Sequence, residues 1–494
     1  MTTSTTTGSA KRYLLRNSLV AALGGLLFGF DTAVISGANE ALRALWSLSD
    51  AQLGFTVASA LIGTIIGSIA VGWPTDRIGR REMLKVLGVL YFVSAVGSAL
   101  AWDWYSFLFF RFIGGLGVGG ASVVSPMYIA EISPARVRGR LVALAQLNIV
   151  AGILLAFLSN YSITLLDLGA VEWRWKFGVE AFPAAAFFLL LFGTPRSPRW
   201  LMAKGREAEA RAVLQKINPD PAAVEEELRA IRESLDLEHH QLNEPFYCRK
   251  YLKPILLAFM IAFFNQASGI NAVLYYAESI FAMAGAGPKM AALQPVILGL
   301  ANLVFTVLAL AVIDHMGRRK LMLVGSIGYI LSLGVTTWAF AVHGGEFKAV
   351  TDALAALNQA RSAGADAATI QQLEAALQAA LPAAAAGGRF VLGALIVFIA
   401  SHAFGQGAVI WVFISEIFPN RVRARGQALG SFTHWVFAAL ISQTFPMVVG
   451  AFGAAAVFGL YTLMMVGQLA WVIWVMPETK GVPLEEIQKK LGID

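Results

Sequence analysis

The chain has 494 residues, of which 57% are hydrophobic and 14% charged, and its mean hydropathy is +0.65. A soluble domain carries about 25% charged residues, so this composition indicates a membrane protein. The net charge of +7 is spread over short loops, so we expect no nucleic-acid partner. The single cysteine, Cys248, excludes an internal disulfide framework and a cysteine-based metal site.

Twelve apolar stretches are long enough to cross a bilayer as helices, which takes about 20 residues each. They are too long for barrel strands, so the sequence predicts an all-α membrane protein. The first stretch lacks a small-residue cleavage pattern and is interpreted as a span, not a signal peptide. The stretches cover 15–37, 52–73, 84–102, 106–130, 141–162, 176–194, 253–283, 293–313, 321–342, 389–415, 426–450 and 454–476.

Basic residues gather on one side of these spans. Nineteen lysines and arginines flank the side that carries both termini, whereas the opposite loops hold seven. The positive-inside rule then places both termini and the loop 195–252 in the cytoplasm. Amphipathic patterning in this loop predicts short helices, with a plain linker as the alternative. The short tails favour a bacterial inner membrane.

Two loop motifs occur twice, in the same order. Asp76–Arg81 (DRIGRR) corresponds to Asp314–Arg319 (DHMGRR), and Glu131–Arg138 corresponds to Glu416–Arg423. Such duplication, with a site between the halves, is typical of secondary transporters. We predict an N-terminal half (1–194), a cytoplasmic helical linker (195–252), a C-terminal half (253–476) and a cytoplasmic tail (477–494).

The second half is longer than the first by 47 residues between its two motifs. The excess matches the polar, alanine-rich stretch 343–388. Leucines recur there at helical spacing on both sides of the turn-like segment 362–366, which predicts a helical hairpin on the outer face. The alternative is an unstructured alanine-rich loop.

Seven motifs run in order along the chain: DRIGRR, PMYIAEISPARVRGR, PRSPRWL, NQASGINAVLYY, DHMGRRK, WVFISEIFPNRVRARG and PETKG. In these motifs the chain resembles the sugar porter family of the major facilitator superfamily over nearly its whole length. The resemblance implies twelve helices in two six-helix halves and transport by alternating access. The chain departs from the family pattern in the 343–388 insertion and at Arg196, where the family has glutamate.

Intramembrane amides and aromatic rings are the candidate sugar ligands. Sugar hydroxyls both donate and accept hydrogen bonds, as amides do, and an aromatic face covers the apolar side of a sugar ring. The resemblance places Gln146, Gln266, Asn271, Asn302 and Trp411 at sugar-contacting positions. Further predicted ligands are Asn265, His434 and Trp435, and Tyr275 and Tyr276 are predicted to gate the outer entrance.

Several features of this set bear on the choice of sugar. Asn265 stands where the family has glutamine, and His434 stands where it has an amide, so the particular sugar stays open. Ser268-Gly269 is expected to bend the seventh span. For any single amide the alternative role is a helix–helix hydrogen bond, worth about 0.6 kcal/mol.

Asp31 is an acid inside the first apolar stretch, and such a residue costs about 2.5–3.5 kcal/mol on insertion scales. We predict that it couples transport to protons together with Arg111 and Glu180. The resemblance supports this role, because proton-coupled sugar porters have aspartate at this position and related facilitators have a neutral residue. The alternative is a static buried ion pair.

The charged loop motifs form the last predicted site. By the resemblance, these residues latch the two halves together when the cytoplasmic side is closed. The alternative is that they serve as a topology signal only, with surface pairs worth about 0–1 kcal/mol. The predicted latch residues are Asp76, Arg80, Arg81, Glu131, Arg138, Asp314, Arg318, Arg319, Glu416 and Arg423.

The sequence thus predicts a proton-coupled symporter that imports a monosaccharide. The alternatives are an uncoupled facilitator of the same fold, a proton–inositol symporter and a non-transporting sugar sensor. No nucleophile–base pair or metal cluster stands out, so we expect no enzyme activity, metal or cofactor. The expected partners are the sugar, the proton and the lipid bilayer, and a monomer suffices because one chain holds both halves.

Overall fold

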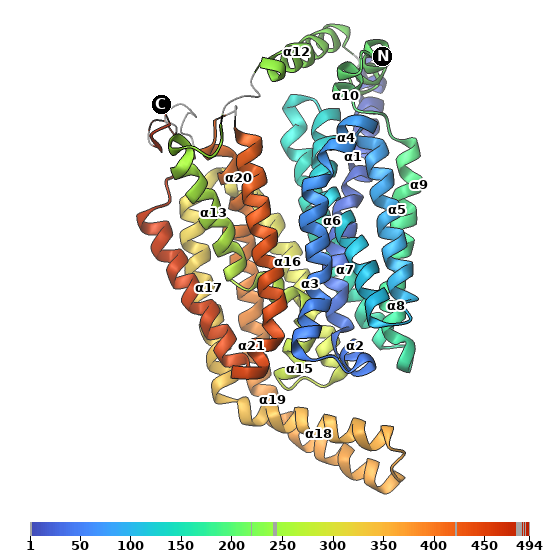
Figure 1. Ribbon diagram of the computed structural model, residues 1–494, viewed down its shortest axis with the longest axis vertical. Coiled ribbons are helices and arrows are strands. Elements are labelled where there is room, and N and C mark those ends of the chain that lie inside the picture. Colours follow the sequence, from blue (N-terminus) through green and yellow to red (C-terminus); the bar gives the residue numbers. More distant parts are fainter. Residues whose placement is uncertain are drawn as a thin grey trace.

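The computed structural model describes residues 2–218, 220–240, 245–419, 422–480, 487, 489 and 491–493. Over these ranges all regular elements are helical. Figure 1 shows two helical bundles side by side. Both termini lie at the end that also carries α10 and α12, which we call the linker end, and α18 lies at the opposite end, which we call the hairpin end.

The N-terminal bundle comprises α1 to α9. Capping boxes at Ser49 and Asp103 begin α3 and α6, because each side chain accepts from the backbone nitrogen three residues later. The helices are α1 (Thr2–Val34), α2 (Asn39–Trp46), α3 (Asp50–Ala70), α4 (Gly72–Ile78), α5 (Arg80–Ala99), α6 (Trp104–Ile132), α7 (Ala135–Thr164), α8 (Glu172–Gly178) and α9 (Ala181–Leu190), with 3₁₀ turns η1 (Ile35–Gly37), η2 (Gly169–Val171) and η3 (Leu191–Gly193).

The linker is formed by α10 (Pro198–Ala203), α11 (Glu207–Ile217) and α12 (Pro221–His240). Trp200, Leu214, Val224 and Leu228 are buried in one small apolar cluster between these helices. The predicted amphipathic helices are therefore confirmed, and their apolar faces pack on one another.

The C-terminal bundle comprises α13 to α21. The long α21 is two helices joined at Gly453, whose φ of 81° and ψ of 163° are not helical. Its elements are η4 (Arg249–Tyr251), α13 (Leu252–Ala267), α14 (Ile270–Tyr275), α15 (Ala277–Met283), α16 (Pro288–Met316), α17 (Arg318–Val342), α18 (Gly344–Ser362), α19 (Ala367–His402), the π-helical turn η5 (Ala403–Gly407), α20 (Ala408–Ile417) and α21 (Arg423–Trp474).

Eleven helical stretches are long and apolar enough to cross a membrane. The break at Gly453 divides the last of these stretches, so the described residues contain the twelve predicted spans. The two bundles meet where α3 packs on α21 and α7 packs on α16.

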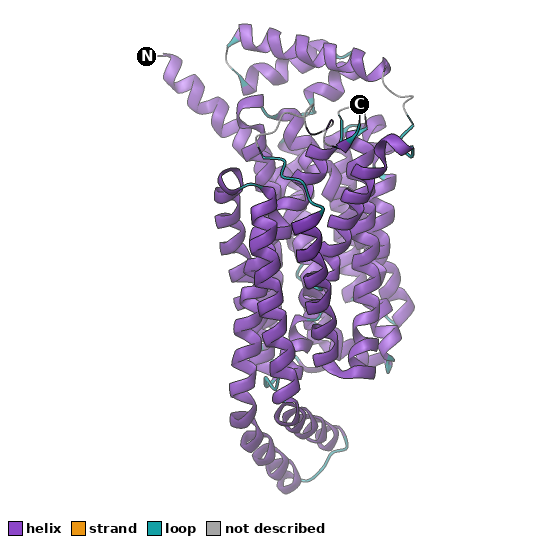
Figure 2. Cartoon of the chain, turned by 90° about the vertical axis from the view of Figure 1, so that its left-hand side faces the viewer, coloured by secondary structure: helices purple, strands orange, loops and turns teal. Residues whose placement is uncertain are grey.

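The predicted helical hairpin in the insertion is confirmed. Helices α18 and α19 are joined by the turn 363–366, and the hairpin projects from the hairpin end (Figure 2). Its buried apolar residues include Phe347, Val350, Leu357, Leu377 and Ala384. The second arm continues without a break into the tenth span, so the insertion lengthens a membrane helix and is not a separate loop.

Candidate functional site

Asp31 and Arg111 form a buried ion pair inside the N-terminal bundle. Nη1 of Arg111, on α6, lies 2.5 Å from Oδ1 of Asp31, on α1, and Nη2 donates to the Asp31 carbonyl at 3.1 Å. Each side chain is only 2% exposed. The guanidinium carbon also lies 5.4 Å from the ring centre of Phe177. Burial of two charges is costly, and their close pairing offsets that cost.

Glu180, at the start of α9, is the third predicted member and is 1% exposed. It interacts electrostatically with both Asp31 and Arg111. Its Oε1 atom, Nε of Arg111 and the hydroxyl of Tyr91 are buried without a hydrogen-bond partner in the described part of the chain. Tyr91, on α5, interacts electrostatically with both acids. Sequence reasoning missed it, because one tyrosine in an apolar helix carries no local signal.

The seventh span is broken where the sequence predicted a bend. Helix α13 ends at Ala267, Gly269 has a φ of 82°, and α14 begins at Ile270. Glycine adopts this left-handed conformation without the steric cost that other residues incur. The break separates Asn265 and Gln266, on α13, from Asn271, on α14.

Three predicted sugar ligands, Gln266, Trp411 and Trp435, contact His434, which is itself a predicted ligand. Nε2 of Gln266 lies 3.3 Å from both ring nitrogens of His434 and 2.9 Å from Oδ1 of Asn265. The His434 ring centre lies 5.4 Å from that of Trp411 and 4.8 Å from that of Trp435. The structure therefore brings amide, imidazole and indole groups from α13, α20 and α21 together.

The other predicted ligands lie on neighbouring helices. Asn302 is buried on α16, where Thr306 Oγ1 donates to its Oδ1 at 3.5 Å. Gln146, on α7, and Asn271, on α14, are half-buried. Because α7 packs on α16, Gln146 and Asn302 belong to the two facing helices of the bundle interface. Their convergence on one sugar stays a prediction.

The two predicted gating tyrosines have different contacts. Tyr276 donates to the Ser442 carbonyl at 2.9 Å and stacks on Phe445, both within the C-terminal bundle. The carbonyl of Tyr275 instead accepts from Nδ2 of Asn39, on α2, at 2.8 Å. The backbone of Tyr275 thus touches the opposite bundle, whereas Tyr276 is held by its own bundle. A gating role for either tyrosine stays a prediction.

The charged loop motifs pair within each bundle. Nε of Arg80 donates to Glu131 at 3.0 Å, and Nη2 of Arg318 donates to Glu416 at 2.8 Å. Ser197 Oγ adds a bond to Glu131, and Thr479 Oγ1 adds the equivalent bond to Glu416 at 2.6 Å. The repeat therefore extends to a third loop, which the sequence comparison of the two halves had missed.

The remaining latch residues also bond locally. Asp76 accepts from Arg80 at 3.0 Å, Arg81 donates to the Thr194 carbonyl at 3.1 Å, Arg319 to the Val472 carbonyl at 3.1 Å, and Arg138 to the Ala130 carbonyl at 3.0 Å. Arg423 begins α21. The side chain of Asp314 lies outside the described residues. A latch between the bundles stays a prediction.

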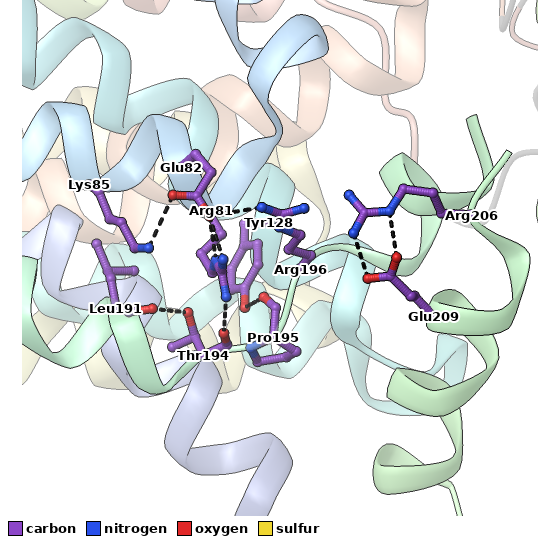
Figure 3. Close-up of polar contacts among 10 residues, drawn as sticks. All are labelled: Arg81, Glu82, Lys85, Tyr128, Leu191, Thr194, Pro195, Arg196, Arg206 and Glu209. Atoms are coloured by element: carbon purple, nitrogen blue, oxygen red, sulfur yellow. Dashed lines mark hydrogen bonds and ion pairs between the residues drawn. The ribbon is translucent and has the colours of Figure 1, made fainter. Parts of the chain in front are cut away.

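Arg196 and Glu478 occupy equivalent places in the repeated third loop. The Glu478 carboxylate accepts from the backbone nitrogens of Arg318 and Arg319, at 3.0 and 3.1 Å, and so caps α17. Arg196 lies 3.7 Å from Glu82, in the first turn of α5, and Glu82 also accepts from Arg81 and Lys85 (Figure 3). Glu82 thus supplies the negative charge that favours a helix N-terminus.

Two further buried amides were missed by sequence reasoning. Gln406, in the π-helical turn, and Gln468, on α21, are both 0% exposed. Nδ2 of Asn265 lies 3.4 Å from Oε1 of Gln406, and Nε2 of Gln406 donates to Oε1 of Gln468 at 2.8 Å. Their only signal in the sequence is an isolated amide within an apolar stretch.

Twelve spans in two repeated bundles, with a buried ion pair and an amide-rich centre, define a secondary transporter of the major facilitator fold. The family model for sugar (and other) transporters matches residues 17–357 and 364–491. The D-xylose-proton symporter of Escherichia coli strain K12 is 35% identical over 512 aligned positions, which cover 96% of this chain and 95% of that relative. The glucose transport protein of Synechocystis is 34% identical, over 96% of this chain and 97% of that relative.

A solved structure of the Escherichia coli xylose transporter, in a partially occluded inward open conformation, matches with a TM-score of 0.78. It is 34% identical and the match covers 96% of this chain and 100% of that chain. The chain therefore belongs to the sugar porter family of the major facilitator superfamily. It is a multi-pass integral membrane transporter and not an enzyme.

Proposed function

We propose that the protein imports a monosaccharide, a pentose or a hexose, together with a proton by alternating access. The observation that carries the proposal is the buried Asp31–Arg111 pair beside Glu180. A proton taken up by Asp31 removes the negative charge that holds Arg111, so protonation and a rearrangement of the N-terminal bundle are linked. One similar relative is itself described as a proton symporter.

The sugar binds in this proposal between the bundles. Gln266, His434, Trp411 and Trp435 lie together in the C-terminal bundle, and Trp435 lies 5.6 Å from Phe28 of α1, measured between ring centres. Phe28 stands three residues before Asp31 on the same helix. A sugar held at this point contacts both bundles, which allows it to bias their relative movement.

The cycle uses both ends of the molecule. Sugar and proton enter at the hairpin end, that end closes through contacts such as Asn39–Tyr275, and the linker end opens. The charged motifs latch the linker end during the other half of the cycle. The termini and linker then face the cytoplasm, the membrane is a bacterial inner membrane, and a monomer is the working unit.

The test is uptake of labelled D-xylose, D-glucose, L-arabinose, D-galactose, D-fructose and myo-inositol into proteoliposomes, with and without an imposed pH gradient. Accumulation of one monosaccharide that requires the gradient supports the proposal. Equilibration without accumulation identifies an uncoupled facilitator. Binding without uptake identifies a sensor, and selective accumulation of myo-inositol identifies a polyol symporter.

A further inference from the structure

A continuous line of side-chain hydrogen bonds crosses the C-terminal bundle. Nε2 of Gln468 donates to Ser326 Oγ at 2.8 Å, and Nε2 of Gln406 donates to Oε1 of Gln468 at 2.8 Å. Nδ2 of Asn265 donates to Oε1 of Gln406 at 3.4 Å, and Nε2 of Gln266 donates to Oδ1 of Asn265 at 2.9 Å. All five side chains are buried, at 0–2% exposure. We call these five residues the amide chain.

The order of donors and acceptors along the amide chain is fixed by Ser326, at the end farthest from Gln266. The hydroxyl of Ser326 has a single hydrogen, which it donates to the Met322 carbonyl at 2.7 Å. Toward Gln468 it can therefore only accept, so Gln468 must present its NH₂ group to Ser326 and its oxygen to Gln406. The same choice passes to Gln406 and then to Asn265, because each amide has a donor end and an acceptor end.

The near end of the chain is the carbonyl oxygen of Gln266. The NH₂ group of Gln266 is directed to Asn265 and to the His434 ring. Its Oε1 atom is buried and has no hydrogen-bond partner in the described part of the chain. A buried acceptor without a partner is costly, and a donor that reaches it removes that cost.

We propose that Gln406 and Gln468 are positioning residues that orient Gln266 so that it presents an acceptor, and not a donor, to the sugar. This inference rests on the proposed function, since it assigns the substrate class of the same site: a sugar with a hydroxyl that donates to Gln266. Asn265 acts within the amide chain, with both ends of its amide engaged, and is a positioning residue and not a direct ligand.

The orientation has a consequence that sugar analogues can report. A deoxy sugar lacks the hydroxyl, and a deoxyfluoro sugar carries fluorine, which accepts weakly but cannot donate. With Gln266 as the acceptor, both analogues bind at least about tenfold more weakly than the parent sugar. Gln406→Leu leaves Asn265 free to turn over, so that Gln266 then presents its NH₂ group, from which fluorine can accept a weak hydrogen bond.

The experiment measures binding of D-glucose and its five monodeoxy and monodeoxyfluoro derivatives to the purified full-length protein by titration calorimetry. D-Xylose and its derivatives replace this set if the unsubstituted protein binds only pentoses. The position whose deoxy derivative binds most weakly identifies the hydroxyl that donates to Gln266. At that position we compare the affinity for the fluoro derivative with the affinity for the deoxy derivative, and call their quotient the fluoro/deoxy ratio. This ratio should be about one in the unsubstituted protein and at least about threefold higher in Gln406→Leu.

Two milder variants and one control complete the design. Gln468→Leu and Ser326→Ala remove the groups at the Ser326 end that fix the order of donors and acceptors. Both should raise the same ratio without changing Gln266 itself. Ser401→Ala removes a buried hydroxyl whose one hydrogen bond, among the residues that the structure describes, is to Val397 within α19, and it should leave the ratio unchanged. Because the readout is a ratio within one variant, a general loss of stability or of active protein does not alter it.

The outcomes separate the two proposals. No binding of any sugar to the unsubstituted protein overturns the proposed function. The positioning role is overturned if the unsubstituted protein binds sugar and every folded amide-chain variant keeps the fluoro/deoxy ratio of the unsubstituted protein. The positioning role is also overturned if the unsubstituted protein binds the deoxy derivatives as tightly as the sugar, because Gln266 then accepts from no hydroxyl.

Discussion

Nδ2 of Asn39 donates to the backbone carbonyl of Tyr275 at 2.8 Å, and this bond joins the two bundles at the hairpin end. Helix α14, which ends at Tyr275, packs on α1. The predicted gate therefore touches the helix that carries the predicted proton site.

This contact predicts that Asn39→Ala shifts the molecule toward opening at the hairpin end. A buried hydrogen bond contributes about 1 kcal/mol, so the ratio of open to closed molecules should rise about fivefold. Spin labels at Leu45 and Met290, both exposed and on opposite bundles, would report the distance distribution in a Cys248→Ser background. Asn148→Ala is the control, because over the described ranges of the chain Asn148 donates only to Leu144 within α7. An unchanged distribution would count against the gate.

Asp31→Asn should separate transport from energy coupling. Asparagine has nearly the same size but carries no titratable carboxyl, so we expect accumulation of sugar under a pH gradient to fall to equilibrium. Counterflow exchange of labelled for unlabelled sugar should persist. Asp167→Asn, in an exposed turn with positive φ that asparagine tolerates, is the matched control. Undiminished accumulation by Asp31→Asn would show that the buried pair is static.

Gly269→Ala should destabilise the break in the seventh span. Its φ of +82° costs a residue with a side chain about 1–2 kcal/mol, and an added Cβ would come within 2.4 Å of the Tyr461 ring, which adds about 1–3 kcal/mol. Gly364→Ala has a similar φ of +68° but open space around it, and so isolates the backbone cost. Chemical denaturation followed by tryptophan fluorescence would compare them, and equal losses would contradict the steric argument.

Features set by one segment of the chain were predictable. The spans follow from apolar length, the break at Gly269 from a glycine in a helical segment, and the α18–α19 hairpin from leucine spacing on both sides of a turn. Each depends on local conformation or on the hydrophobic effect. The bringing together of Asp31 and Arg111 was also predictable, because two buried charges in one half of the chain require partners.

Features set by packing between helices were not predictable from the residues alone. Gln406 and Gln468 are isolated amides, and only the side-by-side arrangement of η5 and α21 makes them neighbours. The charged motifs were expected to pair across the bundles, whereas the described pairs such as Arg80–Glu131 lie within one bundle. Pairing across bundles depends on the conformation, which sequence patterns do not encode.

Glu478→Gln should lower the stability of the C-terminal bundle by about 1 kcal/mol, because α17 loses the charged cap on its first backbone nitrogens. Glu374→Gln, which removes an exposed surface pair with Arg361, should have little effect. Thermal unfolding followed by intrinsic fluorescence would measure both.

The equivalent change in the N-terminal bundle, Arg196→Glu, should give no gain in stability. Glu82 already provides the negative charge at the start of α5, and a second carboxylate would replace the 3.7 Å Arg196–Glu82 attraction with repulsion. The double variant Arg196→Glu, Glu82→Gln removes that repulsion and should recover stability relative to Arg196→Glu alone. A gain in stability in the single variant would mean that Arg196 destabilises the fold. It would also mean that Glu82 does not compensate for the absence of the family's glutamate at position 196.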